Sequence, residues 1–216
     1  MKIFIDSADI DEIIKADSTG LIDGVTTNPT LIRQSGSSPE DVYDRILNET
    51  NITDVSMEIS GSQSEMFQEA DRLIDRYGES FATIKVPMTK DGLFVCRSLS
   101  AVQVRINVTL IFSIPQAILA AKAGAYYVSP FVGRLDDQSV AGLEVVRGIA
   151  SLYQQQAVPT QVLAASIRTV HKAVRSFYNG ASVVTMPPKV FHQMYDHILT
   201  DKGLEIFESD LKQLAL

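Results

Sequence analysis

The sequence of 216 residues is poor in cysteine and has no long hydrophobic run. Its one cysteine, Cys96, excludes a disulfide within the chain and fits a reducing compartment. We interpret Cys96 as a small buried hydrophobe, because no histidine lies near it in the sequence to activate a thiol nucleophile. No segment reaches the roughly 18 consecutive apolar residues that a transmembrane helix requires. We therefore expect no membrane-spanning helix.

The chain also lacks an excess of basic residues. It has 19 Lys and Arg against 26 Asp and Glu, which gives a net charge of −7 and a pI near 4.9. This balance gives no electrostatic reason to expect nucleic acid or a membrane as a partner, although a local basic pocket for a small anion is compatible with it. The first residues, MKIFIDSADI, have neither the apolar segment nor the cleavage site of a signal peptide. We expect a soluble cytoplasmic protein.

Instead of linkers or low-complexity segments, the chain has a short β-rich run followed by an amphipathic stretch, repeated eight times. Strands that alternate with helices of about 10–15 residues predict βαβ units and a parallel sheet. Eight units in about 200 residues fit a (β/α)8 barrel, formed by one domain over residues 1–216. A doubly wound open sheet competes, but no G-x-G-x-x-G follows the first run. The runs are KIFIDS (2–7), GVTTN (24–28), VSMEIS (55–60), ATIKVP (82–87), RINVTLI (105–111), YYVSPFV (126–132), TQVLAAS (160–166) and SVVTMP (182–187).

Helix signals fill the intervals between the runs. Ser38 and Pro39 have the residue types that begin a helix, and Gly78 the type that ends one. The segment 136–155 is predicted as one helix, and 204–214 as a C-terminal helix. The apolar stripe of this last helix either folds back on its own barrel or forms an arm on another subunit. The stripe contains Leu204, Ile206, Phe207, Leu211 and Leu214.

Seven of the eight runs place a polar side chain near the carboxyl end of the strand. In a barrel of this kind the chemistry lies at that end, whereas inward residues elsewhere are packing. A single polar residue there is readily explained as a helix cap or a turn former. Seven that converge on one end of a barrel are not, so we predict a site there. The residues are Asp6, Asn28, Glu58, Lys85, Asn107 with Thr109, Ser129 and Ser166.

Lys85 is the least expected of these residues, because it stands between Ile84 and Val86 in a run that is otherwise apolar. A lysine is almost never fully buried without a partner. A lysine that extends from a sheet edge into water would explain it, but a closed barrel has no edge. Burial disfavours the charged amine, and a neutral amine is what a Schiff base with a carbonyl substrate requires. We predict that Lys85 is catalytic.

Two arginines follow strands at the predicted active end, Arg134 after the sixth run and Arg168 after the seventh. With Ser166 and the amides at the start of the next helix they could form a phosphate clamp. The alternative is a pair of surface salt bridges, for example between Arg134 and Asp136 or Asp137. No group of His, Cys and carboxylates has metal-ligand spacing, so we expect no metal and no cofactor.

Several segments together resemble the transaldolase family, from residue 2 to residue 200. The length matches its small subfamily, which also contains fructose-6-phosphate aldolases. The resemblance implies a class I aldolase barrel that transfers a dihydroxyacetone unit between sugar phosphates in the non-oxidative pentose phosphate pathway. Members often form decamers of two pentameric rings, so it also implies a homo-oligomer. The segments are FIDSADIDEI, GVTTNPTLI, IKVPMTKDGL, INVTLIFS, YVSPFVGRLDD and VLAASIRT.

The resemblance also implies a role for each matching residue. Lys85 would form the Schiff base with the ketose C2, and Asp6 would exchange the proton of the C4 hydroxyl. Glu58 and Thr109 would hold the water that serves carbinolamine dehydration. The remaining residues would bind substrate hydroxyls (Asn28, Asn107 and Ser129) and phosphate (Arg134, Ser166 and Arg168).

Phe131 and Glu58 indicate the branch of the family. The aldolase members are similar but have tyrosine and glutamine at these positions. A tyrosine hydroxyl there would protonate the enamine and release dihydroxyacetone, whereas phenylalanine has no proton to give. Both residues favour a transaldolase. A fructose-6-phosphate aldolase is the nearest alternative, and a non-catalytic barrel that binds a sugar phosphate is a more remote one.

Overall fold

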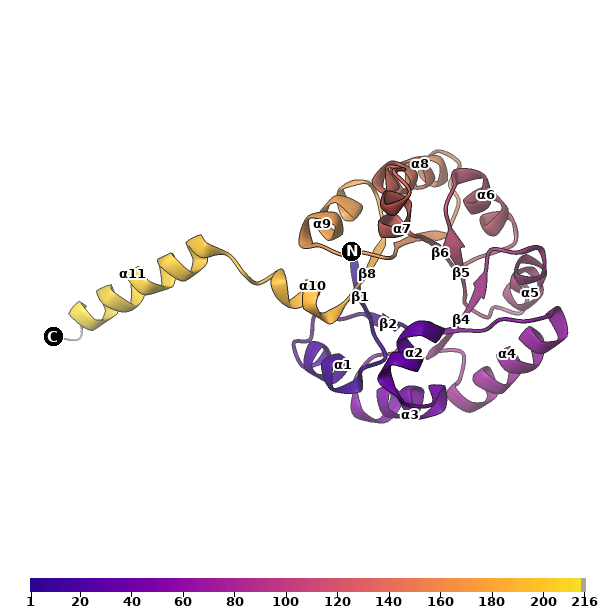
Figure 1. Cartoon of the computed structure of the whole chain (residues 1–216), viewed down its shortest axis with the longest axis horizontal. Helices are drawn as coiled ribbons and strands as arrows, with labels where there is room; N and C mark the ends of the chain where they lie inside the picture. Colours follow the sequence, from indigo (N-terminus) through magenta and orange to yellow (C-terminus); the bar gives the residue numbers. More distant parts are fainter. Residues whose placement is uncertain (215–216) are drawn as a thin grey trace.

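A closed barrel of eight parallel strands forms the body of the protein, in a computed structural model that describes residues 1–214 (Figure 1). The strands follow one another around the barrel in sequence order, and β8 pairs with β1. This confirms the predicted (β/α)8 barrel and excludes the open doubly wound sheet. The strands of residues 1–214 are β1 (Lys2–Asp6), β2 (Gly24–Thr26), β3 (Val55–Glu58), β4 (Ala82–Pro87), β5 (Ile106–Ile111), β6 (Tyr127–Pro130), β7 (Gln161–Ala164) and β8 (Val183–Met186).

Helices surround the barrel in the intervals where the sequence predicts them (Figure 1). In α3, Ser38 accepts a hydrogen bond from the Asp41 amide and Pro39 occupies the first turn. In α4, Ser62 and Glu65 form a capping box. The helices of residues 1–214 are α1 (Ile10–Asp17), α2 (Pro29–Ser35), α3 (Pro39–Glu49), α4 (Gln63–Tyr77), α5 (Lys90–Ser100), α6 (Ile114–Lys122), α7 (Val132–Asp137), α8 (Gly142–Gln155), α9 (Val170–Tyr178), α10 (Pro188–Gln193) and α11 (Ile198–Leu214).

The single helix predicted over 136–155 is wrong, because α7 and α8 are separate helices. Ser139, between them, has a φ of 59°, a left-handed conformation that ends a right-handed helix. The Asp136 carboxylate then accepts a hydrogen bond from the Gly142 amide at 3.2 Å and starts α8. The amphipathic pattern runs through this turn, which is why it indicates one helix.

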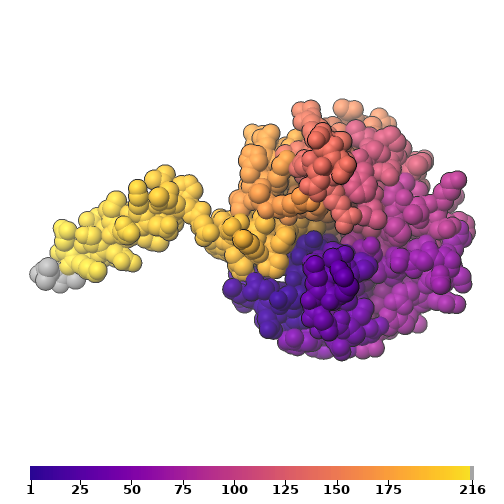
Figure 2. All heavy atoms as spheres, in the orientation of Figure 1, coloured from indigo at the N-terminus to yellow at the C-terminus, as the bar shows by residue number. Residues whose placement is uncertain are grey.

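The C-terminal helix begins at Ile198, six residues before the predicted start, and projects away from the barrel (Figures 1 and 2). None of its residues is buried, so the apolar side chains from Leu204 to Leu214 stay exposed. In this structure the helix therefore does not fold back on its own barrel. Among residues 1–214, no helix combines the length and the apolar character needed to cross a membrane.

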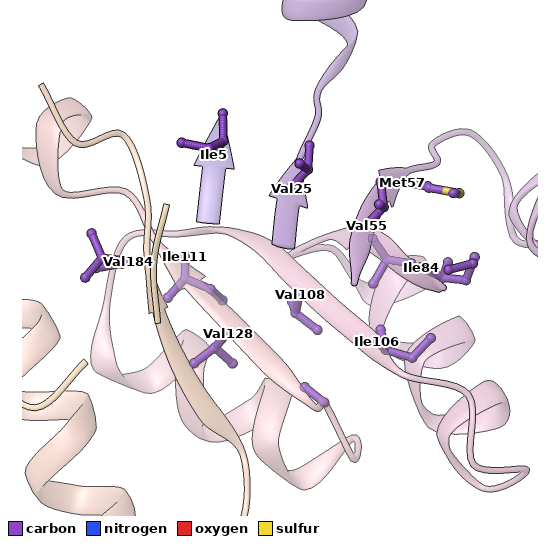
Figure 3. Packing of buried hydrophobic residues seen from close by; sticks show 14 of the residues in the cluster. Ile5, Val25, Val55, Met57, Ile84, Ile106, Val108, Ile111, Val128 and Val184 are labelled. Atoms are coloured by element: carbon purple, nitrogen blue, oxygen red, sulfur yellow. The ribbon is translucent and has the colours of Figure 1, made fainter. Parts of the chain in front are cut away.

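The apolar core has two parts, because side chains alternate between the two faces of each strand. One face packs against the surrounding helices and includes Ile5, Val25 and Ile84 (Figure 3). The other face fills the barrel interior with a smaller cluster. Gly24 makes room for it, since a Cβ there would lie 2.5 Å from the Phe4 ring. The smaller cluster consists of Phe4, Tyr127, Leu163, Ala165 and Val183.

A polar network closes the end of the barrel where the strands begin. Asp54, which directly precedes β3, accepts hydrogen bonds from Thr83 Oγ1 at 2.7 Å and Tyr127 Oη at 2.8 Å. The Arg105 guanidinium lies 3.2 Å from the same carboxylate and also donates to the Ser80 carbonyl. The catalytic end of a barrel is the opposite one, so this network is part of the scaffold.

Candidate active site

Lys85 lies at the centre of the polar residues inside the barrel. It is in register with Glu58 on β3 and Asn107 on β5, so the three side chains point to the same side of the sheet. The side chain is almost completely buried, with the residue 4 % exposed. Its Nζ donates to the Thr27 carbonyl at 2.8 Å and lies 2.9 Å from Glu58 Oε2. The buried amine thus has the partners that its charged form requires.

Asp6 ends β1 and is half-buried at the mouth of the barrel. Thr26 Oγ1 donates to its Oδ1 at 2.8 Å, and Thr185 Oγ1 lies 2.7 Å from Thr26 Oγ1. Burial raises the pKa of the Asp6 carboxyl above its ordinary value of 3.8, although the charge on Lys85 opposes this shift. A raised pKa suits a group that must both take up and return a proton, because it lies nearer the operating pH.

Asn107, Ser129 and Thr109 form the buried wall beside Lys85. Asn107 Nδ2 donates to Ser56 Oγ at 3.1 Å, and Ser129 Oγ donates to Asn107 Oδ1 at 2.7 Å. The Thr109 hydroxyl is also fully buried, yet it has no hydrogen-bond partner among the described residues. Buried hydroxyls are nearly always hydrogen-bonded, so Thr109 has donor and acceptor capacity for a small polar molecule.

A cavity of about 100 Å³ opens at the carboxyl ends of the strands, and seven of the predicted site residues line it. Phe131 packs edge-on against Phe112, with their ring centroids 5.8 Å apart. The Arg134 guanidinium lies over the Phe131 ring, 4.9 Å from the ring centroid. The predicted residues in the wall are Asp6, Asn28, Lys85, Ser129, Phe131, Arg134 and Ser166, and the others are Thr26, Leu163, Ala165 and Thr185.

Gly133 in α7 and Ser166 in the loop after β7 hold the rim of this cavity together. The Gly133 amide donates to the Ser166 carbonyl at 3.0 Å, and a Cβ on Gly133 would lie only 2.3 Å from that oxygen. Ser166 itself has a φ of 58°, which a non-glycine residue rarely adopts. The start of α7 therefore contacts the loop after β7, and this contact brings Ser166 and Arg134 into one cavity wall.

The two predicted phosphate-binding arginines differ in their surroundings. Arg168 is exposed outside the wall of the cavity and makes two hydrogen bonds of 2.6 Å to the Asp137 carboxylate, which lower the pKa of Asp137. Arg134 lines the cavity and has no carboxylate partner among residues 1–214. The salt bridge weighed as an alternative for Arg134 is thus formed by Arg168.

A second cavity lies beside the first. Asn28 lines both cavities, whereas Glu58 lines only the second. This cavity has a volume of about 260 Å³, and its walls come from α2, α3 and α4 together with the end of β3. Asn28 caps α2, since its Oδ1 accepts from the Leu31 amide at 3.0 Å. Glu58 contacts Lys85 from this side, so the Lys85–Glu58 pair lies between the two cavities.

Thr26 and Thr185 line the first cavity but are absent from the predicted site. Thr185 gives the eighth strand a buried polar residue at the active end, in addition to the seven predicted. The period-2 alternation of β2 and β8 was the signal, because it places both hydroxyls on the barrel side. Thr26 directly supports Asp6, so it belongs to the same group.

Cys96 is a buried residue of α5, and burial raises the pKa of its thiol to about 12. It therefore stays protonated and is no candidate nucleophile. Among residues 1–214, no three side chains of His, Cys, Asp or Glu lie close enough together to hold a metal ion.

Comparison with known proteins gives a consistent result. The family model described as Transaldolase/Fructose-6-phosphate aldolase matches residues 3–215. A probable transaldolase of Ruegeria sp. (strain TM1040) is 44% identical over 219 residues, which cover 100% of this chain and 99% of the relative. Another from Ruegeria pomeroyi is 45% identical and covers 98% and 97%. A third, from Symbiobacterium thermophilum, is 45% identical and covers 97% and 96%.

Proposed function

Because the chain belongs to the transaldolase/fructose-6-phosphate aldolase family, we propose that it is a transaldolase acting through a Schiff base on Lys85. It would transfer a dihydroxyacetone unit from sedoheptulose 7-phosphate to glyceraldehyde 3-phosphate, giving erythrose 4-phosphate and fructose 6-phosphate, a reaction of the pentose phosphate pathway. The observation that carries the proposal is the buried amine of Lys85, held beside a carboxylate inside the barrel.

The first half of the reaction joins Lys85 to the substrate. Glu58, 2.9 Å from Nζ, accepts a proton from the ammonium. The neutral amine attacks C2 of the ketose, and the carbonyl electrons move to its oxygen, which takes up that proton. Glu58 passes a second proton from the nitrogen of the resulting carbinolamine to its hydroxyl, which leaves as water and gives the iminium. Thr109 and Glu58 hold this water, in agreement with the unpartnered buried hydroxyl of Thr109.

The second half breaks and remakes a carbon–carbon bond. Asp6 takes the proton of the C4 hydroxyl, the C3–C4 bond breaks, and its electrons move into the iminium to give an enamine on Lys85. The aldehyde leaves and a second aldehyde enters. The enamine attacks it, Asp6 returns its proton to the new hydroxyl, and an iminium forms again. Addition of water to C2 of this iminium then breaks the C–N bond, which releases the product ketose and the Lys85 amine. Asn28, Ser129 and the buried Asn107 behind Ser129 hold the hydroxyls of the three-carbon unit.

The phosphate group of donor or acceptor binds at the rim. Arg134 and Ser166 face the cavity, and Arg134 has no other anion as partner among residues 1–214. Arg168 joins them by giving up one or both of its bonds to Asp137, 2.6 Å each. A phosphate dianion competes well for such an exposed pair, because surface ion pairs are worth only about 0–1 kcal/mol.

Phe131 favours transfer over simple cleavage. Its ring lines the cavity next to Ser129 and offers no hydroxyl to protonate the enamine. The enamine therefore waits for an aldehyde. A fructose-6-phosphate aldolase would instead release free dihydroxyacetone from fructose 6-phosphate alone. Measuring dihydroxyacetone with and without an acceptor aldehyde distinguishes the two activities.

We also propose that the protein is a homo-oligomer. The support is α11, whose apolar side chains are exposed along a helix that extends beyond the barrel (Figure 2). Burial on another subunit would remove this surface from water, at about 25 cal/mol per Å² of apolar area. A decamer of two pentamers is the arrangement that the family resemblance implies.

The deciding experiment is borohydride reduction in the presence of fructose 6-phosphate, followed by mass spectrometry of the peptides. We expect the mass of a reduced sugar adduct on Lys85. Lys90 serves as an internal control, because it lies five residues further along the chain and is exposed at the start of α5. Sugar binding without any adduct would support the alternative of a non-catalytic barrel, and an adduct on another lysine would contradict the assignment to Lys85.

A further inference from the structure

The main chain, as well as Glu58, orients the side-chain amine of Lys85. Its Nζ donates to the carbonyl oxygen of Thr27 at 2.8 Å, and Thr27 is fully buried. Thr27 follows β2, where its amide donates to the Ser56 carbonyl at 3.2 Å. The direction of the amine thus depends on how firmly the backbone of Thr27 is held.

The Thr27 side chain ties this backbone to a helix outside the barrel. Its Oγ1 lies 3.1 Å from the Ser56 carbonyl and 3.1 Å from Tyr43 Oη on α3. A threonine hydroxyl has one hydrogen, and a carbonyl accepts only, so Thr27 donates to Ser56. Tyr43 must then be the donor to Thr27. Burial raises the pKa of Tyr43 to about 12, so this donor keeps its proton throughout the range in which the enzyme would be assayed.

We propose that Tyr43 is a positioning residue for the Schiff-base lysine. Its hydroxyl fixes Thr27, and the Thr27 carbonyl in turn directs the Lys85 amine toward the carbonyl carbon of the substrate. The inference rests on the proposed function, because it assigns Tyr43 to the imine-forming step. Tyr43 and Glu58 line the same side cavity, so both groups that orient Lys85 reach it from the helix layer side of the barrel.

Tyr43→Phe tests this with the loss of one oxygen atom, and Tyr77→Phe is the matched control. The two rings pack edge-on with centroids 5.9 Å apart, and both hydroxyls are hydrogen-bonded. The Tyr77 hydroxyl donates to Asp44 at 2.9 Å, on the outer side of α3 and away from Thr27. Tyr43→Phe loses a buried hydrogen bond and Tyr77→Phe a partly buried one, but only Tyr43→Phe loosens Thr27.

The measurement is the single-turnover rate of borohydride trapping on Lys85 with fructose 6-phosphate. We expect Tyr43→Phe to slow it about threefold to tenfold, the rate equivalent of one hydrogen bond, and Tyr77→Phe to leave it unchanged. Affinity for hexitol 6-phosphate, which has no carbonyl and forms no imine, should stay at the wild-type value in both variants. A general structural effect would lower that affinity and the trapping rate together.

Thr27→Val provides a second test, because it removes the acceptor of the Tyr43 hydroxyl and keeps the side-chain shape. If the two residues act through one link, adding Tyr43→Phe to Thr27→Val should slow trapping no further. Trapping at the wild-type rate in Tyr43→Phe, equal slowing in Tyr77→Phe, or additive losses in the double variant would each overturn the inference. Absence of a Lys85 adduct in the wild type would refute the proposed function, and this inference with it.

Discussion

The two ends of the barrel interior use polar residues in opposite ways. Where the strands begin, Thr83, Tyr127 and Arg105 saturate the Asp54 carboxylate, and the Arg105 Nε has no partner among residues 1–214. Where the strands end, the buried hydroxyl of Thr109 has no partner in the described part of the chain, and burial raises the pKa of Asp6. Unsatisfied buried groups cost stability, and each end has one, so the contrast lies in the carboxylates: Asp54 is fully paired, whereas Asp6 has a raised pKa and faces a cavity. The contrast separates scaffold from site without reference to any relative.

The largest expected effect comes from Lys85→Met. It should abolish activity at the end of the barrel where the strands end and the cavity opens (the open end). The polar network around Asp54, where the strands begin (the closed end), should stay intact. Methionine has a similar volume but no amine, so no Schiff base can form. We expect transfer activity to fall by roughly 10⁴–10⁶-fold, the scale seen when a covalent nucleophile is removed. Coupled assays and circular dichroism measure activity and fold. Substantial transfer by the folded variant would contradict the lysine mechanism.

Asp6→Asn should separate activity from stability. Loss of the proton acceptor should lower turnover by roughly 10²–10⁴-fold while borohydride still traps the adduct on Lys85. The pKa of the Asp6 carboxyl is raised in the folded protein. Such a group lowers the free energy of unfolding as the pH rises from the pKa of the unfolded state through the pKa of the folded state. At pH 7 the neutral asparagine removes this cost, so Tm should rise, and should do so less at pH 4.

Two outcomes would contradict this role of Asp6. If trapping and turnover fell in parallel, Asp6 would be a binding or structural residue rather than the base. A lower Tm at pH 7 would show that the bond from Thr26 outweighs the effect of burial.

Asp54→Asn, at the closed end, should lower the free energy of unfolding and leave the activity unchanged. It keeps the shape of the side chain but leaves Arg105 without its carboxylate, 3.2 Å away. Breaking a largely buried ion pair costs about 3 kcal/mol of unfolding free energy, measured by urea titration. The kcat at 25 °C should stay close to the wild-type value. Tyr127→Phe, which removes one hydrogen bond to Asp54, is the milder control. A large loss of kcat in either variant would break the separation of the two ends.

Substitutions of Arg168 and Asp137, at the rim of the open end, should affect activity less than those of Lys85 and Asp6. Arg168→Ala should weaken binding of phosphorylated sugars by roughly 1.5–3 kcal/mol, the scale of a charge-assisted hydrogen bond, and affect non-phosphorylated acceptors much less. Asp137→Asn removes the competing carboxylate and should change KM for phosphorylated sugars in the opposite direction. Equal losses for both classes of sugar in Arg168→Ala would assign Arg168 to the fold.

The smallest effect on activity should come from removing residues 198–216, because α11 lies outside both ends of the barrel. If its apolar side chains pack on a neighbour, light scattering should show a smaller assembly, and measurable activity should survive. An unchanged mass would show that α11 does not hold the oligomer together.

Much of this organisation could be predicted from local patterns. The alternation of strands and helices predicts the barrel, and Lys85 is conspicuous because it interrupts an apolar run. Other features depend on contacts between residues distant in sequence. The pairing of Arg168 with Asp137, 31 residues away, depends on which loops meet at the rim. The break between α7 and α8 depends on the conformation of Ser139, a residue type that gives little warning of it.

The shared register of Glu58, Lys85 and Asn107 has a consequence for how such a protein can change over generations. A slip of one residue in any of these three strands would turn its side chain to the helix side, and in a closed barrel every strand is paired on both sides, so none can slip without disturbing two neighbours. The three side chains therefore keep their common placement only as long as the register of all three strands is kept. Arg134 lies on the short helix α7 and Ser166 on the loop after β7, where single replacements leave the strands in place. Descendants of this chain would diversify in substrate long before they diversified in chemistry.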